Sequence, residues 1–136
     1  MKSIKIILLV SVLGIYSCKK DKEEAPPKRT SPIGYWKGLY GTGTNPQTQN
    51  YSWLFRSNGT IRVYSQAADT TGGSKAEGTY SVSGTIITNS YTYISGPLTG
   101  TFSTNSAVDA NFQTLTGTYG SGTATSGGGT FTLTFQ

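Results

Sequence analysis

The chain has 136 residues, of which 12% are charged and 35% are hydrophobic, and its formal net charge is +5. A chain of this length holds one ordinary domain, which excludes a large multidomain enzyme. It contains no histidine and a single cysteine, so histidine-dependent acid–base catalysis, histidine metal sites and an intrachain disulfide are excluded by counting alone.

The first segment, residues 1–17, has the composition of a signal peptide. Lys2 and Lys5 are followed by an apolar run that stops just before Cys18. This run is shorter than the stretch of about 17–25 apolar residues that a transmembrane helix needs. We therefore predict that residues 1–17 are a cleaved signal peptide of the lipoprotein type.

A specific motif closes this segment. Ile15-Tyr16-Ser17-Cys18 resembles the lipobox of bacterial lipoproteins, in which a small residue precedes the cysteine that is acylated and becomes the mature N-terminus. The resemblance implies acyl chains on Cys18 that anchor the protein stably to a membrane. The charged tract of residues 19–24 resembles the surface-export tag of Bacteroidota lipoproteins. Together these features imply an outer-membrane lipoprotein, on the cell surface or facing the periplasm.

Residues 18–32 predict a lipidated cysteine followed by a disordered tether, because they are rich in charge and proline and poor in apolar side chains. The predicted folded domain is 33–136. From residue 32 onward there are four basic and three acidic residues, so the net charge of this part is only +1. Four scattered basic residues do not form the basic stripe that a nucleic-acid-binding protein presents, and we expect no nucleic-acid partner.

From Ile33 onward, short runs rich in Thr, Tyr, Phe, Val and Ile alternate with polar residues, and no helical periodicity occurs. The pattern predicts about eight strands, with Asn58-Gly59 as the strongest hairpin signal. Phe112 and Leu115 have opposite parities, which indicates a bulge or a late strand start. The predicted strands are Gly34–Tyr40, Asn50–Arg56, Thr60–Gln66, Ala76–Ser83, Thr85–Tyr93, Leu98–Ser103, Phe112–Tyr119 and Gly129–Phe135, with longer loops at 41–49, 67–75, 104–110 and 120–128.

The fold class that follows is all-β. Alternation places Tyr51, Trp53 and Phe55 on one inward face, while threonines cover the outside of the strands. A Gly-Thr-aromatic phrase recurs, as in Gly78-Thr79-Tyr80, and glycine opposite a neighbouring aromatic residue helps a sheet to bend. We predict an antiparallel up-and-down β-barrel of about eight strands, closed by pairing of the last strand with the first. A two-sheet β-sandwich is the alternative.

The first predicted strand adds a resemblance. Gly34-Tyr35-Trp36, together with the phrase from Gly78 to Gly84, is similar to the small lipocalin-like domains of Bacteroidota lipoproteins. The resemblance covers residues 33–136 and implies a lipocalin-like barrel.

The interior of an eight-stranded barrel is either filled by side chains or holds one small ligand. A pocket at one mouth would bind a small apolar or aromatic ligand by area and stacking, with an arginine at the rim to orient a carboxylate. The candidate ligand-binding residues are Trp36, Trp53, Arg56, Arg62, Tyr91, Tyr93 and Phe102. The alternative is a filled barrel that acts as a surface module for an envelope glycan or protein, with Tyr40, Tyr64 and Tyr119 exposed on the outside.

We predict no enzymatic activity. The folded part has three carboxylates, Asp69, Glu77 and Asp109, and nothing in their spacing forces two of them together as glycosidase chemistry requires. No cysteine nucleophile, serine elbow or phosphate-binding loop occurs in this part. The sequence therefore predicts a monomeric, membrane-anchored envelope lipoprotein that binds without catalysis and needs no metal or cofactor.

Overall fold

The computed structural model describes residues 28–136. The predicted signal peptide, Cys18 and the first part of the predicted tether lie outside the described residues. Residues 28–136 contain eight strands and no helix. Among them, no helix has the length and apolar character needed to cross a membrane.

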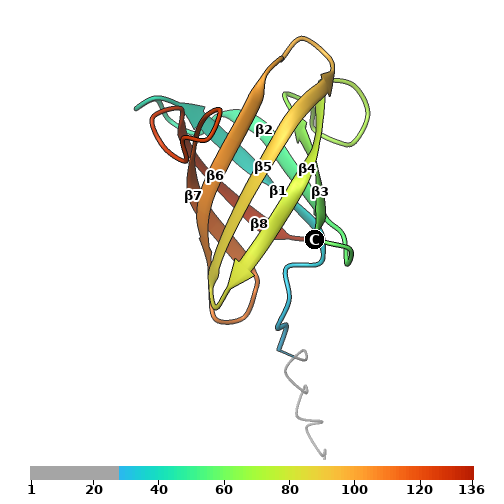
Figure 1. Cartoon of the computed structure of the whole chain (residues 1–136), viewed down its shortest axis with the longest axis vertical. Coiled ribbons are helices and arrows are strands. Elements are labelled where there is room, and N and C mark those ends of the chain that lie inside the picture. Colours follow the sequence, from blue (N-terminus) through green and yellow to red (C-terminus); the bar gives the residue numbers. More distant parts are fainter. Residues whose placement is uncertain (1–27) are drawn as a thin grey trace, which may run out of the picture.

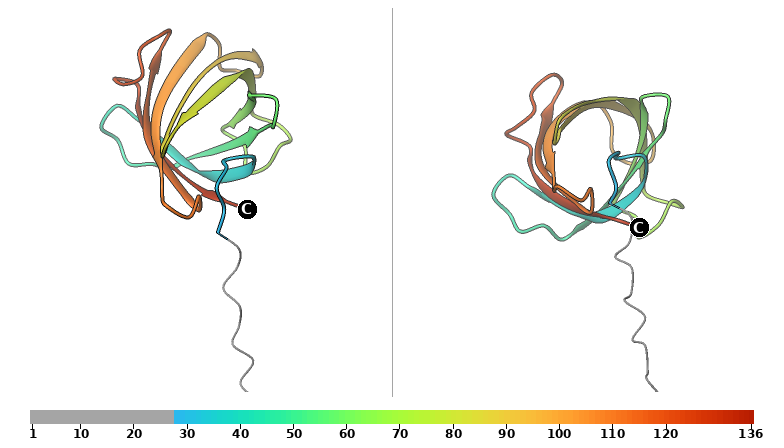
Figure 2. Two further views of the ribbon diagram at one scale, coloured as in Figure 1. Left: turned by 60° about the horizontal axis from the view of Figure 1, so that its bottom comes forward. Right: turned by 90° about the horizontal axis from the view of Figure 1, so that it is seen from below.

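The eight strands form one closed antiparallel barrel in which each strand pairs with the next and β8 pairs with β1 (Figure 1). The view along the barrel shows the closed ring of strands (Figure 2). The barrel prediction is therefore confirmed against the sandwich alternative. The strands are β1 (Gly34–Thr42), β2 (Gln49–Phe55), β3 (Thr60–Ser65), β4 (Ser74–Ser83), β5 (Ile86–Ser95), β6 (Thr101–Val108), β7 (Thr114–Ser121) and β8 (Gly129–Phe135).

The sixth strand differs most from its prediction. β6 begins at Thr101 and runs to Val108, so most of the loop predicted at 104–110 is strand. The inward positions of this stretch include Thr104 and Ser106, which are buried but small and polar. They give no apolar alternation, and the sequence pattern therefore places the strand too early, at Leu98–Ser103, and misses its second half. Of the two alternatives for the seventh strand, a bulge or a late start, the structure shows the late start, because β7 begins at Thr114.

Two inward glycines leave room for close packing, Gly117 for an aromatic ring and Gly78 for the backbone of the neighbouring strand. Gly117 pairs with Phe131, and a Cβ atom at Gly117 would lie 2.8 Å from the Phe131 ring. Gly78 pairs with Tyr91, and a Cβ atom there would lie 1.9 Å from the backbone oxygen of Ser90. Both glycines are therefore required for close strand and side-chain packing.

One end of the barrel is filled. Here the chain enters β1, and Trp36 is fully buried between the rings of Phe55 and Phe135 in edge-to-face contacts. The Trp36 indole N–H donates to the backbone oxygen of Pro32 at 2.7 Å, and the Arg29 guanidinium carbon lies 3.3 Å from the centre of the Phe135 ring. Residues 28–32, predicted as part of the tether, therefore pack against this end of the barrel, which we call the entry end.

The opposite end, which we call the mouth, carries the loops 43–48, 66–73, 96–100 and 122–128. Figures 1 and 2 show these loops on the side of the barrel away from the entering chain. The strand pairing explains this separation, because the first residue of β1, Gly34, pairs with the last residue of β2, Phe55, at the entry end. The side chains just inside the mouth form the candidate site.

Candidate functional site

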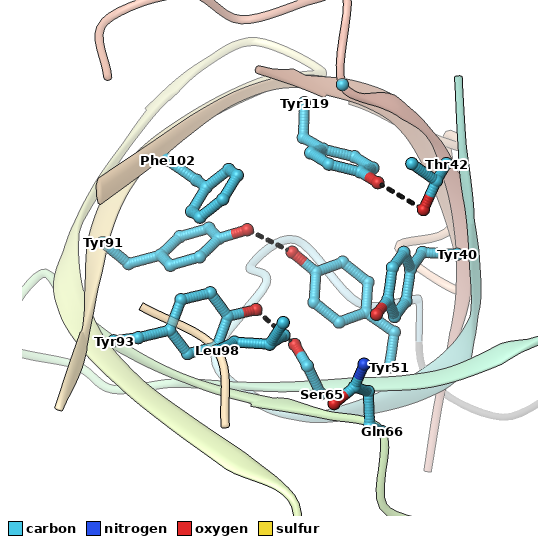
Figure 3. Close-up of a pocket in the computed structure, with 11 residues that line it drawn as sticks. Tyr40, Thr42, Tyr51, Ser65, Gln66, Tyr91, Tyr93, Leu98, Phe102 and Tyr119 are labelled. Atoms are coloured by element: carbon cyan, nitrogen blue, oxygen red, sulfur yellow. Dashed lines mark hydrogen bonds between the residues drawn. The ribbon is translucent and has the colours of Figure 1, made fainter. Parts of the chain in front are cut away.

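A pocket of about 300 Å³ opens at the mouth of the barrel (Figure 3). This volume is at the lower end of the range seen for small-molecule sites, about 300–1,000 Å³. Its walls come from β1, β2, β3, β5, β6 and β7 and from the loops between them. The lining residues are Tyr40, Thr42, Tyr51, Ser65, Gln66, Tyr91, Tyr93, Leu98, Phe102, Tyr119 and Gly128.

Hydrogen bonds to groups on other strands hold the tyrosine hydroxyls in place. The hydroxyls of Tyr51 and Tyr91 lie 2.5 Å apart and join β2 to β5 across the barrel (Figure 3). The hydroxyl of Tyr93 lies 2.5 Å from Ser65 Oγ, and that of Tyr119 donates to the backbone oxygen of Gly41 at 3.2 Å. The pocket is therefore formed before any ligand arrives, which lowers the entropic cost of binding.

Aromatic faces and edges make up the apolar part of the walls. Tyr91 and Phe102 lie nearly parallel, with ring centres 6.2 Å apart, and Tyr93 meets Phe102 edge-on at 5.7 Å. On the facing wall, the ring centres of Tyr40 and Tyr51 are 5.0 Å apart. Such walls offer a flat ligand large contact areas and ring edges.

Burial keeps these tyrosines in the neutral form. Burial raises the pKa of Tyr93 to about 12, and the hydrogen bond from Ser65 only partly opposes this shift. Burial and the neighbouring tyrosines also raise the pKa of Tyr51 and Tyr91 well above the ordinary value of 10. The pocket therefore presents neutral phenol groups, which donate or accept hydrogen bonds without adding charge.

Among residues 28–136, no charged side chain lines the pocket. The two candidate arginines lie elsewhere: Arg56 is in the turn after β2 at the entry end, and Arg62 faces outward from β3. Both pair with Glu77 on β4, Arg56 at 2.9 Å. Burial acts to raise the pKa of Glu77, but hydrogen bonds from the two arginines outweigh it and lower that pKa. The expectation that Arg56 or Arg62 orients a carboxylate at the pocket is therefore wrong.

The other predicted ligand-binding residues are split between the two ends. Tyr91, Tyr93 and Phe102 line the pocket. Trp36 and Trp53 do not line it, and both are fully buried within the core. The two tryptophans pair with each other across β1 and β2, and Trp36 belongs to the filled entry end.

The structure also corrects the outward tyrosines. Tyr40 and Tyr119 point into the barrel and line the pocket, and Tyr64, on the outer face of β3, is only 6% exposed. Alternation along β1 is enough to predict the inward direction of Tyr40. Tyr40 lies four residues after the inward Trp36, so both side chains are on the same face of the strand.

Alternation alone does not predict that Ser65 and Gln66 lie at the pocket, because their position depends on where β3 ends. Ser65 is the last residue of that strand, and Gln66 follows it in a left-handed conformation with φ of 65°. This conformation is uncommon for a residue other than glycine. It places Gln66 at the rim of the pocket, where its amide lies beside Tyr40 (Figure 3).

The acidic residues are dispersed. Glu77 is on the outside of the barrel, Asp69 lies in the loop 66–73 at the mouth, and Asp109 lies in the loop after β6 at the entry end. Within residues 28–136, no group of three metal-ligating side chains comes together. Comparisons of the chain with protein-family models, with curated proteins and with solved structures find no match.

Proposed function

We propose that this protein is a membrane-anchored envelope lipoprotein whose barrel binds a small, flat, uncharged ligand in the tyrosine-lined pocket without catalysis. The observation that carries the proposal is the pocket itself. It combines an open mouth, aromatic walls and hydroxyls already fixed by hydrogen bonds. This combination of apolar area with a few placed polar groups is typical of small-molecule sites.

The absence of charge in the lining supports an uncharged ligand. Burying an ionised group without a partner costs several kcal/mol or more. The part of the chain that the structure describes places no cation in the pocket wall, and the raised pKa values keep Tyr51, Tyr91 and Tyr93 neutral at pH 7. The dispersed carboxylates support a binding role, because none of the three lines the pocket. A reaction that needs an acid–base pair has no such pair among the described residues at this site.

The anchor is the second part of the proposal and rests on the lipobox resemblance at Cys18. The described chain joins the barrel at the entry end, opposite the mouth (Figure 2). A lipid anchor upstream of residue 28 would thus attach the barrel by its filled end and leave the mouth facing away from the membrane. Labelling with an alkyne fatty acid tests this part: we expect label in the wild-type protein and none in Cys18→Ala, which should leave the membrane fraction.

Native mass spectrometry of protein purified gently from its own host tests the binding role. We expect a reproducible added mass of small-molecule size. Leu98→Trp provides a blocked variant, because Leu98 lines the pocket from a loop outside the strands. Ile94→Trp adds a tryptophan at a site on β5 that is 63% exposed and serves as the matched control. Retention of the added mass by Leu98→Trp, or its loss in both variants, would contradict binding in this pocket.

A further inference from the structure

A second set of polar groups lies below the floor of the pocket. The hydrogen-bonded pair Tyr51–Tyr91 crosses the barrel and forms this floor (Figure 3). Because inward side chains recur every two residues along a strand, the next inward residue toward the entry end is Trp53 on β2 and Asn89 on β5. On β6, the inward residue below Phe102 is Thr104, and it pairs directly with Asn89.

These three residues carry buried polar atoms without hydrogen-bond partners. They are both amide atoms of Asn89, the Thr104 hydroxyl and the Trp53 indole N–H. The side chains are 4%, 0% and 0% exposed, respectively. The Trp53 indole acts to lower the pKa of the Tyr51 hydroxyl, which burial raises. Its N–H nevertheless makes no hydrogen bond of normal geometry. We call Trp53, Asn89 and Thr104 the inner polar layer.

The inner polar layer stands out from the rest of the described chain. Six buried side-chain atoms in residues 28–136 lack a partner, and four of them belong to this layer. Other inward polar groups are satisfied: Ser106 Oγ donates to the backbone oxygen of Ile87 at 2.9 Å, and Ser65 bonds to Tyr93. Buried polar groups are nearly always hydrogen-bonded in proteins, so a cluster of exceptions next to a pocket calls for a specific explanation.

We propose that the inner polar layer is the inner part of the binding site, and that the Tyr51–Tyr91 pair separates to admit the polar edge of the ligand. This inference rests on the proposed binding function and specifies the ligand class. An asparagine amide offers a donor and an acceptor side by side, and their complement is a ring with an adjacent C=O and N–H, a cyclic amide. The Thr104 hydroxyl and the Trp53 N–H supply further donors for the ligand carbonyl.

The arrangement above the layer suits the remainder of such a ligand. When the Tyr51–Tyr91 bond opens, both hydroxyls become free to bond the ligand. The parallel rings of Tyr91 and Phe102 and the facing ring of Tyr51 then contact its flat faces. An anionic edge does not fit, because no cationic side chain of the described segment lines the pocket and the layer itself has no charged residue.

Isothermal titration calorimetry with three related probes tests the inference: 2-quinolone, 1-methyl-2-quinolone, which lacks the amide N–H, and quinoline, which lacks the amide. We expect 2-quinolone to bind the wild-type protein at least about tenfold more tightly than either of the others. Asn89→Leu, which keeps the shape of the side chain, should remove this preference for the cyclic amide. Asn105→Leu, at an exposed position on the outer face of β6, is the matched control and should keep the preference.

The outcomes separate this inference from the binding role on which it rests. If the three probes bind with the same affinity, both in the wild-type protein and in Asn89→Leu, the inner site is overturned and the binding role stands. If no probe binds wild type, both proposals fail for flat ligands of this class. A measurement without ligand adds a check: because the Asn89 amide has no partner in the free protein, Asn89→Leu should raise the thermal midpoint. A lowered midpoint would contradict an unpartnered amide.

Discussion

The two ends of the barrel use the same strands and the same alternation, yet they differ in what their inward side chains do. At the entry end, Trp36, Phe55 and Phe135 fill the interior by edge-to-face packing. At the mouth, tyrosines take the inward positions, and their hydroxyls bond to partners on other strands while leaving a pocket of about 300 Å³. The comparison shows that packed rings close the entry end, whereas hydrogen-bonded tyrosines, together with Phe102, leave a pocket open at the mouth.

The largest expected effect comes from a matched pair of phenylalanine substitutions. Phe55 is 1% exposed and packed at the entry end, whereas Phe102 is partly exposed and lines the pocket. We expect Phe55→Ala to lower the free energy of unfolding by about 3–5 kcal/mol, because it leaves a closed cavity. Phe102→Ala should cost about 1 kcal/mol, since water can enter the space it leaves. Urea denaturation measures both, and equal losses would remove the distinction between the two ends.

High pH should destabilise the mouth specifically. The pKa of Tyr93 is raised to about 12, so the folded state holds this proton more tightly than the unfolded chain, whose tyrosines ionise near pH 10. The contribution of Tyr93 to the free energy of unfolding is therefore fully present below pH 10 and is lost as the pH rises toward 12. Its size is roughly 2–3 kcal/mol. Unfolding free energies measured from pH 9 to 12 should fall less steeply in Tyr93→Phe. Identical slopes in the two proteins would show that Tyr93 is not buried as described.

The Tyr51–Tyr91 bond gives a smaller effect that a double-mutant cycle isolates. Each single change to phenylalanine removes one hydroxyl and leaves the other buried without its partner, which should cost about 1–3 kcal/mol. The double variant should cost less than the sum of the two, because no unpaired hydroxyl remains. Chemical denaturation of the four proteins gives the coupling energy. Strict additivity would mean that the two hydroxyls do not interact.

The ion pairs on the outside of the barrel should matter least. Glu77 pairs with Arg56 and Arg62, but about a third of each side chain is exposed, so Glu77→Gln should cost about 0.2–1 kcal/mol and less at high salt. Because the pKa of Glu77 is lowered, its contribution is present above the ordinary carboxyl value and is lost as the pH falls below it. Denaturation at pH 7 and pH 3 checks the size and sign. An effect of Glu77→Gln on binding of 2-quinolone would contradict the location of these charges outside the site.

The fold was largely predictable because alternation is a local signal. Inward runs such as Tyr51, Trp53 and Phe55 gave the faces, and the Asn58-Gly59 turn gave a hairpin. β6 was misplaced because its inward side chains, Thr104 and Ser106, are small and polar, and their burial depends on the opposite wall of the barrel.

The candidate site was predictable only in part, for a related reason. Tyr91, Tyr93 and Phe102 were identified as inward aromatic residues, but the sequence does not tell at which height along the barrel each one lies. Height depends on the register between strands, which places Trp36 opposite Trp53 and Ser65 within reach of Tyr93. A residue such as Gln66, in a strained turn, joins the site through that register and has no local signature.

The most direct test of the division between the two ends is an NMR titration of a chain starting at residue 28 with 2-quinolone. This chain contains the whole barrel, which closes between β1 and β8. We expect the backbone amide signals of residues around the mouth, such as Tyr40, Tyr91 and Phe102, to shift, and those of Trp36 and Phe55 at the entry end to stay in place. The absence of shifts at the mouth, or shifts centred on the entry end, would contradict a binding site in the tyrosine-lined pocket.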